Sequence, residues 1–97
     1  MYIIDGIAYA GEQKQPVKVV GIKVMPEYKL WVRFNTGESR LFDFFSLLND
    51  PCYTALKDKK LFSDVYIDYG VPSWDNGNID ISPEYIYNNS IPYEMAV

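Results

Sequence analysis

Three consecutive runs, over residues 17–24, 28–35 and 39–44, read as β-strands, and in the first two an apolar side chain recurs at every second position. A period of two is that of a β-strand with one buried face. Pro26 and Glu27 separate the first two runs, and the sequence Thr36-Gly37-Glu38 separates the second from the third. Connections this short join neighbouring antiparallel strands, so the pattern predicts a three-stranded antiparallel meander.

The same alternation predicts which side chains share a face. Those assigned to one face in the first two runs are Val20, Ile22, Val24, Leu30, Val32 and Phe34. Trp31 and Arg33 lie between these positions, and they must therefore point to the opposite side of the sheet.

Beyond residue 44 the pattern changes. Apolar residues over 44–62 are too dense for alternation and predict one or two short helices, one of which starts at Asp50-Pro51 with Asp50 as N-cap. Alternation returns over residues 64–69 and 79–81, which predicts two further strands. Ser82-Pro83-Glu84 predicts a last short helix.

These elements predict one α+β domain over residues 17–90, with an antiparallel sheet of about five strands and short helices on one face. Residues 1–16 are interpreted as an N-terminal hairpin extension, because two short apolar runs flank Asp5-Gly6. Residues 91–97 are interpreted as a loosely held tail.

The composition excludes several classes of enzyme. The chain has 97 residues, no histidine and a single cysteine, Cys52. A histidine-based triad, a histidine metal site, a cysteine-rich zinc site and an internal disulfide all need residues that these 97 lack. Phosphate-binding glycine loops and calcium-loop spacings are also absent from the sequence. We therefore expect no independent catalysis, no metal and no cofactor.

Charge is distributed unevenly along the chain. There are 9 basic and 13 acidic residues, for a net charge of −4, and every basic residue lies at or before Lys60. The acidic residues after Lys60 can attract the basic first half of the chain, can form a surface that a partner recognises, or can simply be solvated. Direct nucleic-acid binding needs a basic stripe and is not expected. No apolar run approaches the roughly 20 residues that span a bilayer, and no signal peptide is visible, so we expect no membrane association and a cytoplasmic location.

Aromatic residues make up 16% of the chain. The phenylalanines expected in the core are Phe34, Phe42, Phe44, Phe45 and Phe62. Outward-facing Trp31 and Arg33, together with Tyr66 and Asp68 of the 64–69 run, are the candidate contact surface, because aromatic and charged side chains are typical of protein interfaces. Arg33 and Asp68 can pair across strands. Alternatively, residues 91–97 or the N-terminal hairpin fold over Trp31.

A set of short motifs, in order along the chain, also resembles a known family. The motifs are residues 30–38, Phe42-Asp43, Leu56-Lys57-Asp58, Leu61-Phe62, residues 65–68, Trp74, Asn76-Gly77, residues 79–81 and Pro83-Glu84-Tyr85. They resemble the bacterial family catalogued as domain of unknown function 2442, over roughly residues 17–90. The resemblance implies an α+β domain with a helical cover, similar to the N-terminal domain of a nitrosomonad accessory protein, and no known activity.

The resemblance also bears on function. Some family members continue into a DNA-binding helix-turn-helix, and others are encoded beside a small protein in what look like toxin–antitoxin pairs. The resemblance therefore implies a protein-binding module. Its partner is another protein or a second copy of this chain, and one possible role is that of an antitoxin bound to the neighbouring small protein. The alternative is a small-ligand-binding or carboxylate-dependent catalytic domain that uses Asp68 and Tyr66.

Overall fold

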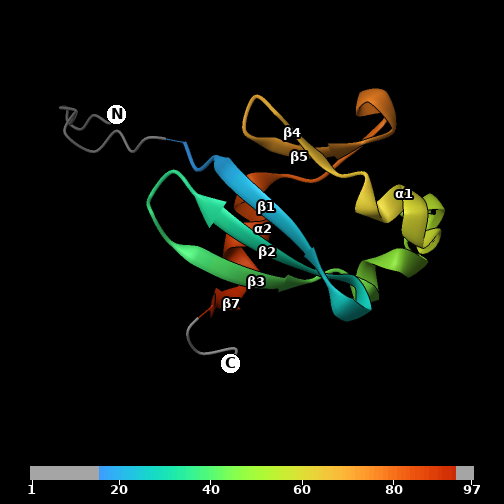
Figure 1. Ribbon diagram of the computed structural model, residues 1–97, viewed down its shortest axis with the longest axis horizontal. Helices are drawn as coiled ribbons and strands as arrows, with labels where there is room; N and C mark the ends of the chain where they lie inside the picture. The colour runs from blue at the N-terminus through green and yellow to red at the C-terminus, as the bar shows by residue number, and fades with distance from the viewer. Residues whose placement is uncertain (1–15, 94–97) are drawn as a thin grey trace, which may run out of the picture.

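The computed structural model describes residues 16–93, which form two antiparallel sheets with short helices (Figure 1). The hairpin predicted for residues 1–16 lies outside the described residues, apart from Pro16. The α+β class is confirmed, but the prediction of one sheet of about five strands is wrong. The strands divide into a four-stranded sheet and a three-stranded sheet.

The four-stranded sheet contains the predicted meander. Its strands are β1 (Val19–Met25), β2 (Lys29–Phe34), β3 (Ser39–Asp43) and β7 (Ile91–Pro92), in the order β1-β2-β3-β7. All neighbouring strands are antiparallel. The face assignment for β2 is confirmed, because Leu30, Val32 and Phe34 are almost fully buried.

A bulge in β1 corrects the face assigned to Val20. The register shifts between Val19, which pairs with Phe34, and Gly21, which pairs with Arg33. Two residues of β1 therefore span one step of β2, and the side chain of Val19 turns into the core while Val20 is 57% exposed. Beyond the bulge the alternation continues as predicted.

The three-stranded sheet, in the order β4-β5-β6, was not foreseen as a separate unit. Its strands are β4 (Tyr66–Asp68), β5 (Val71–Trp74) and β6 (Ile79–Asp80). Tyr69 and Gly70 both have positive φ and form a two-residue turn between β4 and β5, as tight hairpins require. One backbone hydrogen bond of 2.9 Å, from the N–H of Val19 to the carbonyl oxygen of Gly70, links the two sheets.

Short helical segments connect the strands and cover the core. They are η2 (Pro26–Tyr28), η3 (Phe45–Asn49), η4 (Thr54–Lys57), α1 (Lys59–Ser63), η5 (Asp75–Gly77) and α2 (Pro83–Asn88). Ser82 caps α2 as predicted, because its hydroxyl oxygen accepts a hydrogen bond from the N–H of Tyr85. The helix predicted to start at Asp50-Pro51 is a turn instead, in which the Asp50 carboxylate accepts from the N–H of Cys52.

One core lies between the four-stranded sheet, α2, the 44–63 segment and the second sheet. Its buried apolar residues are Val19, Leu30, Val32, Phe34, Phe42, Phe44, Leu48, Leu56, Phe62, Trp74, Ile81 and Ile86. Four of the five phenylalanines predicted for the core are there. Phe45 is the exception, since it is 62% exposed. The Asp43 carboxylate accepts a hydrogen bond from the N–H of Phe45 and fixes the chain where β3 turns into η3.

The start of the predicted tail is a strand. Ile91 and Pro92 form β7, which pairs with Leu41 and Arg40 of β3. The interpretation of residues 91–97 as a loose tail is therefore wrong for Ile91 and Pro92, and residues 94–97 lie outside the described part of the chain.

Candidate protein-contact surface

The four-stranded sheet has one covered and one open face. Helix α2 packs on the covered face, where Tyr87 meets Phe34 and Tyr85 meets Phe42 edge to face. On the other face, no helix formed by residues 16–93 lies over the strands (Figure 1). Pairing across the strands aligns Lys23, Trp31, Leu41 and Ile91 in one row on this open side. We call this row, with Met25, Arg33 and Tyr93, the Trp31 face.

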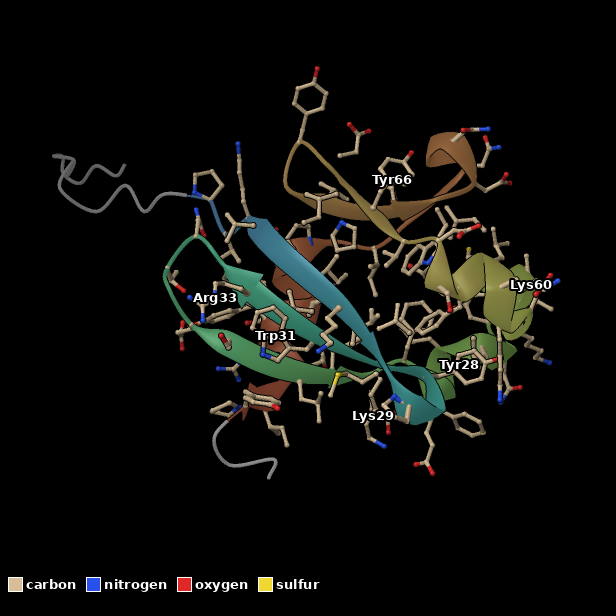
Figure 2. All side chains as sticks on the ribbon, viewed as in Figure 1. Tyr28, Lys29, Trp31, Arg33, Lys60 and Tyr66 are labelled. Atoms are coloured by element: carbon tan, nitrogen blue, oxygen red, sulfur yellow. The ribbon has the colours of Figure 1, made fainter. Side chains whose placement is uncertain are left out.

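Trp31 stands at the centre of the Trp31 face and is partly exposed (Figure 2). Tyr93 packs edge-on against its indole, with the ring centroids 6.5 Å apart. A hollow of about 260 Å³, lined by Lys23, Met25, Trp31 and Tyr93, opens beside it. Of the segments that the alternative interpretation placed over Trp31, the structure describes only residues 91–93 and Pro16, and Tyr93 covers one edge of the ring and leaves the hollow beside it.

Arg33 is exposed and associates with Trp31. Its guanidinium carbon lies 5.7 Å from the centre of the indole, in the range of a cation–π contact. The ion pairs within residues 16–93 are Lys29 with Glu27 and Arg40 with Glu38. The pairing that Arg33 and Asp68 could form is absent from this part of the chain, in which the Arg33 guanidinium forms no ion pair.

Tyr66 and Asp68 belong to a different sheet. Both are in β4 and exposed, as the alternation predicted, whereas Trp31 and Arg33 are in β2. Figure 2 shows Tyr66 on the far side of β1 from Trp31 and Arg33. The four candidate residues therefore form two separate pairs, Trp31 with Arg33 and Tyr66 with Asp68.

A polar cluster holds β7 and Tyr93 in place, and sequence reasoning did not identify it. Arg40 donates from Nε to the Ser90 hydroxyl at 2.8 Å and from a terminal nitrogen to the Ser90 carbonyl oxygen at 2.7 Å. Its guanidinium also lies 4.8 Å from the centre of the Tyr87 ring. These contacts anchor the residue that precedes β7. No signal in the sequence connects residues that stand so far apart along the chain.

Glu38 completes this cluster. The Tyr87 hydroxyl donates a hydrogen bond to the Glu38 carboxylate, and Arg40 lies 3.6 Å from the same group. The bond from Tyr87 is the main reason why the pKa of Glu38 is lowered, and bonding to Glu38 raises the pKa of Tyr87. The carboxylate nearest to Arg33 along the β2–β3 hairpin therefore already has partners of its own.

A second surface feature surrounds the turn between β1 and β2. Glu27 and Tyr28 both adopt positive φ, which is strained for residues with side chains. The Tyr28 hydroxyl donates to the carbonyl oxygen of Lys57, and its ring packs 5.0 Å from that of Phe62. These contacts hold the turn against the helical segment. Exposed Phe45 stands beside it, 6.3 Å from the Tyr28 ring.

Other chemistry-bearing residues do not assemble into a site within residues 16–93. No group of three or more cysteine, aspartate or glutamate side chains there could hold a metal ion. Cys52 is exposed and unpaired in its turn. None of the helices in this part of the chain has the length and apolar character needed to cross a membrane.

The fold and this surface define a small α+β domain with an open, aromatic sheet face. Residues 19–92 match the model of the family described as "Protein of unknown function (DUF2442)", and the chain belongs to this family. No curated protein and no solved structure matches the chain.

Proposed function

We propose that this domain is a protein-binding module and that the Trp31 face is its contact surface. The observation that carries the proposal is the position of Trp31, a large aromatic side chain at the centre of a sheet face that no helix of the described chain covers. Aromatic and arginine side chains contribute most of the binding energy in protein interfaces, and Trp31 stands next to Arg33.

The surroundings of Trp31 support this proposal. Met25, Leu41, Ile91 and Tyr93 extend the apolar surface around the indole, and Ile91 is 50% exposed. Charged Lys23 and Arg33 are exposed at its border. An apolar centre with a charged border is the usual arrangement of a specific interface. Among the partners open to such a surface, a small protein encoded beside the gene fits the antitoxin-like role implied by the family resemblance.

The alternative of a small-ligand or carboxylate-dependent catalytic domain has less support. Tyr66 and Asp68 are exposed on a three-residue strand, and neither lines the hollow beside Trp31. A catalytic carboxylate normally works in a concave site that excludes water. Screening metals and metabolites by thermal shift tests this alternative, because only a specific ligand would give a saturable shift that Asp68→Asn abolishes.

The proposed function is tested by removing the indole. Trp31→Ala is expected to weaken association, either with itself in sedimentation velocity or with the purified product of a neighbouring gene, by at least about 2 kcal/mol if Trp31 is a hot spot. Tyr66→Ala tests the second sheet separately. Tyr69→Ala is the matched control, because Tyr69 is 93% exposed and lies at the tip of the β4–β5 turn.

The outcome against the proposal is a folded Trp31→Ala variant that associates as the unmodified protein does. If Tyr66→Ala alone weakens association, the contact surface lies on the three-stranded sheet instead. Circular dichroism of each variant establishes that the fold is retained.

A further inference from the structure

An exposed phenylalanine stands where β3 ends and the helical segment begins. Phe45 is 62% exposed, and a hollow of about 520 Å³ opens beside it. Sites of roughly 300–1,000 Å³ take up whole small molecules, so this hollow has room for an aromatic side chain. Its lining residues, which we call the Phe45 patch, are Glu27, Tyr28, Lys29, Asp43, Phe45 and Lys59.

The Phe45 patch is distinct from the Trp31 face, with which it shares no residue. Lys29 and Asp43 pair across β2 and β3, two positions along β2 from Trp31. In Figure 2, Tyr28 lies beside the helical segment, and Arg33 lies toward the opposite end of β2. A contact made by the Phe45 patch can therefore be removed without replacing any residue of the Trp31 face.

Tyr28 gives the hollow a fixed wall. Glu27 and Tyr28 adopt positive φ, which is strained for both, and the contacts of Tyr28 with Lys57 and Phe62 hold the turn in this conformation. Strain that surrounding contacts maintain in this way is concentrated at functional sites. A surface that is already ordered also loses little conformational entropy when it binds a partner.

The charges of the Phe45 patch come from two parts of the fold. The sheet and its β1–β2 turn contribute Glu27, Lys29 and Asp43, which together carry one net negative charge, and α1 contributes Lys59. Lys29 is already paired with Glu27 at 3.7 Å, whereas Lys59 forms no ion pair within residues 16–93. The patch therefore combines an exposed aromatic ring with a negative side and a positive side.

We propose that two copies of this chain associate through their Phe45 patches about a twofold axis. A twofold interface uses the same surface on both copies, so that surface must be complementary to itself. The Phe45 patch meets this requirement, because the rotation places Lys59 of one copy against Glu27 and Asp43 of the other. The Phe45 ring of each copy enters the hollow of the other and packs on its Phe45 and Tyr28 rings.

Other occupants match the Phe45 patch less well. A strongly acidic or strongly basic segment of another protein would meet like charge on one side of the patch. Two Trp31 faces would also match each other poorly, since each carries exposed Lys23 and Arg33 at its border. The inference does not rest on the proposed function, and it leaves the Trp31 face free for a different protein.

The test is sedimentation velocity of the full chain at micromolar to millimolar concentrations, where a reversible monomer–dimer equilibrium is expected. Phe45→Ala is expected to raise the dissociation constant of the dimer about a hundredfold, because the substitution enters a twofold interface twice and each aromatic anchor contributes about tenfold. Tyr69→Ala removes another exposed ring, outside the patch, and is the matched control that should leave the dimer unchanged. Circular dichroism establishes that both variants are folded.

An exchange of charges tests the twofold arrangement. Lys59→Glu and Glu27→Lys each place like charges opposite one another, so each variant alone is expected to dimerise more weakly than the unmodified chain. An equimolar mixture of the two is expected to dimerise again, because every contact between positions 59 and 27 then joins opposite charges. Lys60→Glu makes the same change in net charge on α1 outside the lining of the hollow, and it should have little effect (Figure 2 labels Lys60).

Three results would overturn the inference. The first is a chain that stays monomeric at every concentration, and the second is a folded Phe45→Ala variant that dimerises as the unmodified chain does. The third is a mixture of the two charge variants that dimerises no better than either alone. Self-association that Trp31→Ala weakens and Phe45→Ala does not would give the second of these results while supporting the proposed function, so the two proposals fail separately.

Discussion

The indole nitrogen of Trp74 donates a 2.9 Å hydrogen bond to the carbonyl oxygen of Phe62, and the two rings are nearly parallel at 6.0 Å. Trp74 ends β5, and Phe62 lies in α1. This one contact therefore joins the three-stranded sheet to the helical segment, and it does so in the core, where Trp74 is fully buried.

The two tryptophans are expected to differ sharply in their contribution to stability. Trp74→Phe removes buried ring atoms and leaves the carbonyl of Phe62 without its donor, which should cost about 2–4 kcal/mol. Trp31→Phe, on the partly exposed sheet face, should cost less than about 1 kcal/mol. Urea unfolding followed by circular dichroism measures both. Similar losses would mean that Trp31 also belongs to the core.

The adjacent residues Phe44 and Phe45 provide a second contrast. Phe44 is fully buried and meets Phe62 and Trp74 edge to face, so Phe44→Ala should cost about 3–5 kcal/mol. Phe45 is mostly exposed, and Phe45→Ala should change the free energy of unfolding by no more than about 1 kcal/mol. The pair is measured under the same denaturant conditions. A large loss in Phe45→Ala would contradict the orientation of this segment.

Alanine substitutions at Gly70 and Gly37 are expected to differ in their cost, because only one of them adds a steric clash to the backbone strain. Both have positive φ, and a Cβ at Gly70 would stand 2.8 Å from the Cβ of Lys18, whereas one at Gly37 would meet nothing within 4 Å. Gly37→Ala should therefore cost only the strain, about 1–2 kcal/mol. Gly70→Ala carries the same strain and the clash, so its melting temperature should be clearly the lower of the two. Equal melting temperatures would count against the close approach of Lys18.

The bond between Tyr87 and Glu38 predicts a pH effect with a defined sign. Because the folded-state pKa of Glu38 is lowered, its contribution to stability is present above the unfolded-state pKa and is lost as the pH falls through the folded value. The pKa of Tyr87 is raised above its usual 10.0, so its contribution is present below that value and is lost as the pH rises through the folded one.

Tyr87→Phe removes this bond and should return the pKa of Glu38 toward its ordinary value. Thr36→Val is the matched control, since Thr36 also bonds to Glu38 but lowers its pKa less. The Glu38 carboxyl carbon followed by NMR across the acidic range reports both variants. An unchanged titration in Tyr87→Phe would show that another group lowers the pKa.

The first half of the fold could be predicted because its strands are long enough for an apolar residue to recur at every second position. Leu30, Val32 and Phe34 have buried faces that only one register satisfies, and the intervening turns are short. The bulge at Val20 could not be predicted in this way, because an extra residue in one strand leaves the apolar pattern looking continuous.

The second half was harder because its elements are very short. β4 has three residues and β6 has two, too few to establish a period, and Pro72 argued against the strand β5 that contains it. Pro72 is accommodated because its carbonyl oxygen still accepts a hydrogen bond from Ile81. Tyr69-Gly70 was not recognised as a hairpin turn, although the glycine at its second position is the usual signal.

The candidate surface could be predicted only within one strand. Alternation placed Trp31 and Arg33 together on the outer face, since both belong to β2. It could not place Tyr66 and Asp68 relative to them, because that depends on how two sheets pack. The contact of Tyr93 with Trp31, and the cluster around Arg40 that supports it, join residues far apart in the chain and leave no local signal.

Each sheet is assembled almost wholly from strands that follow one another along the chain, with β7 as the exception. Contacts between consecutive strands close short loops, and domains rich in them fold quickly. The meanders β1-β2-β3 and β4-β5-β6 should therefore form early in folding. The docking of α2 and β7 onto β3 should be the later and slower step. Substitutions at Arg40 would then accelerate unfolding while leaving the folding rate nearly unchanged.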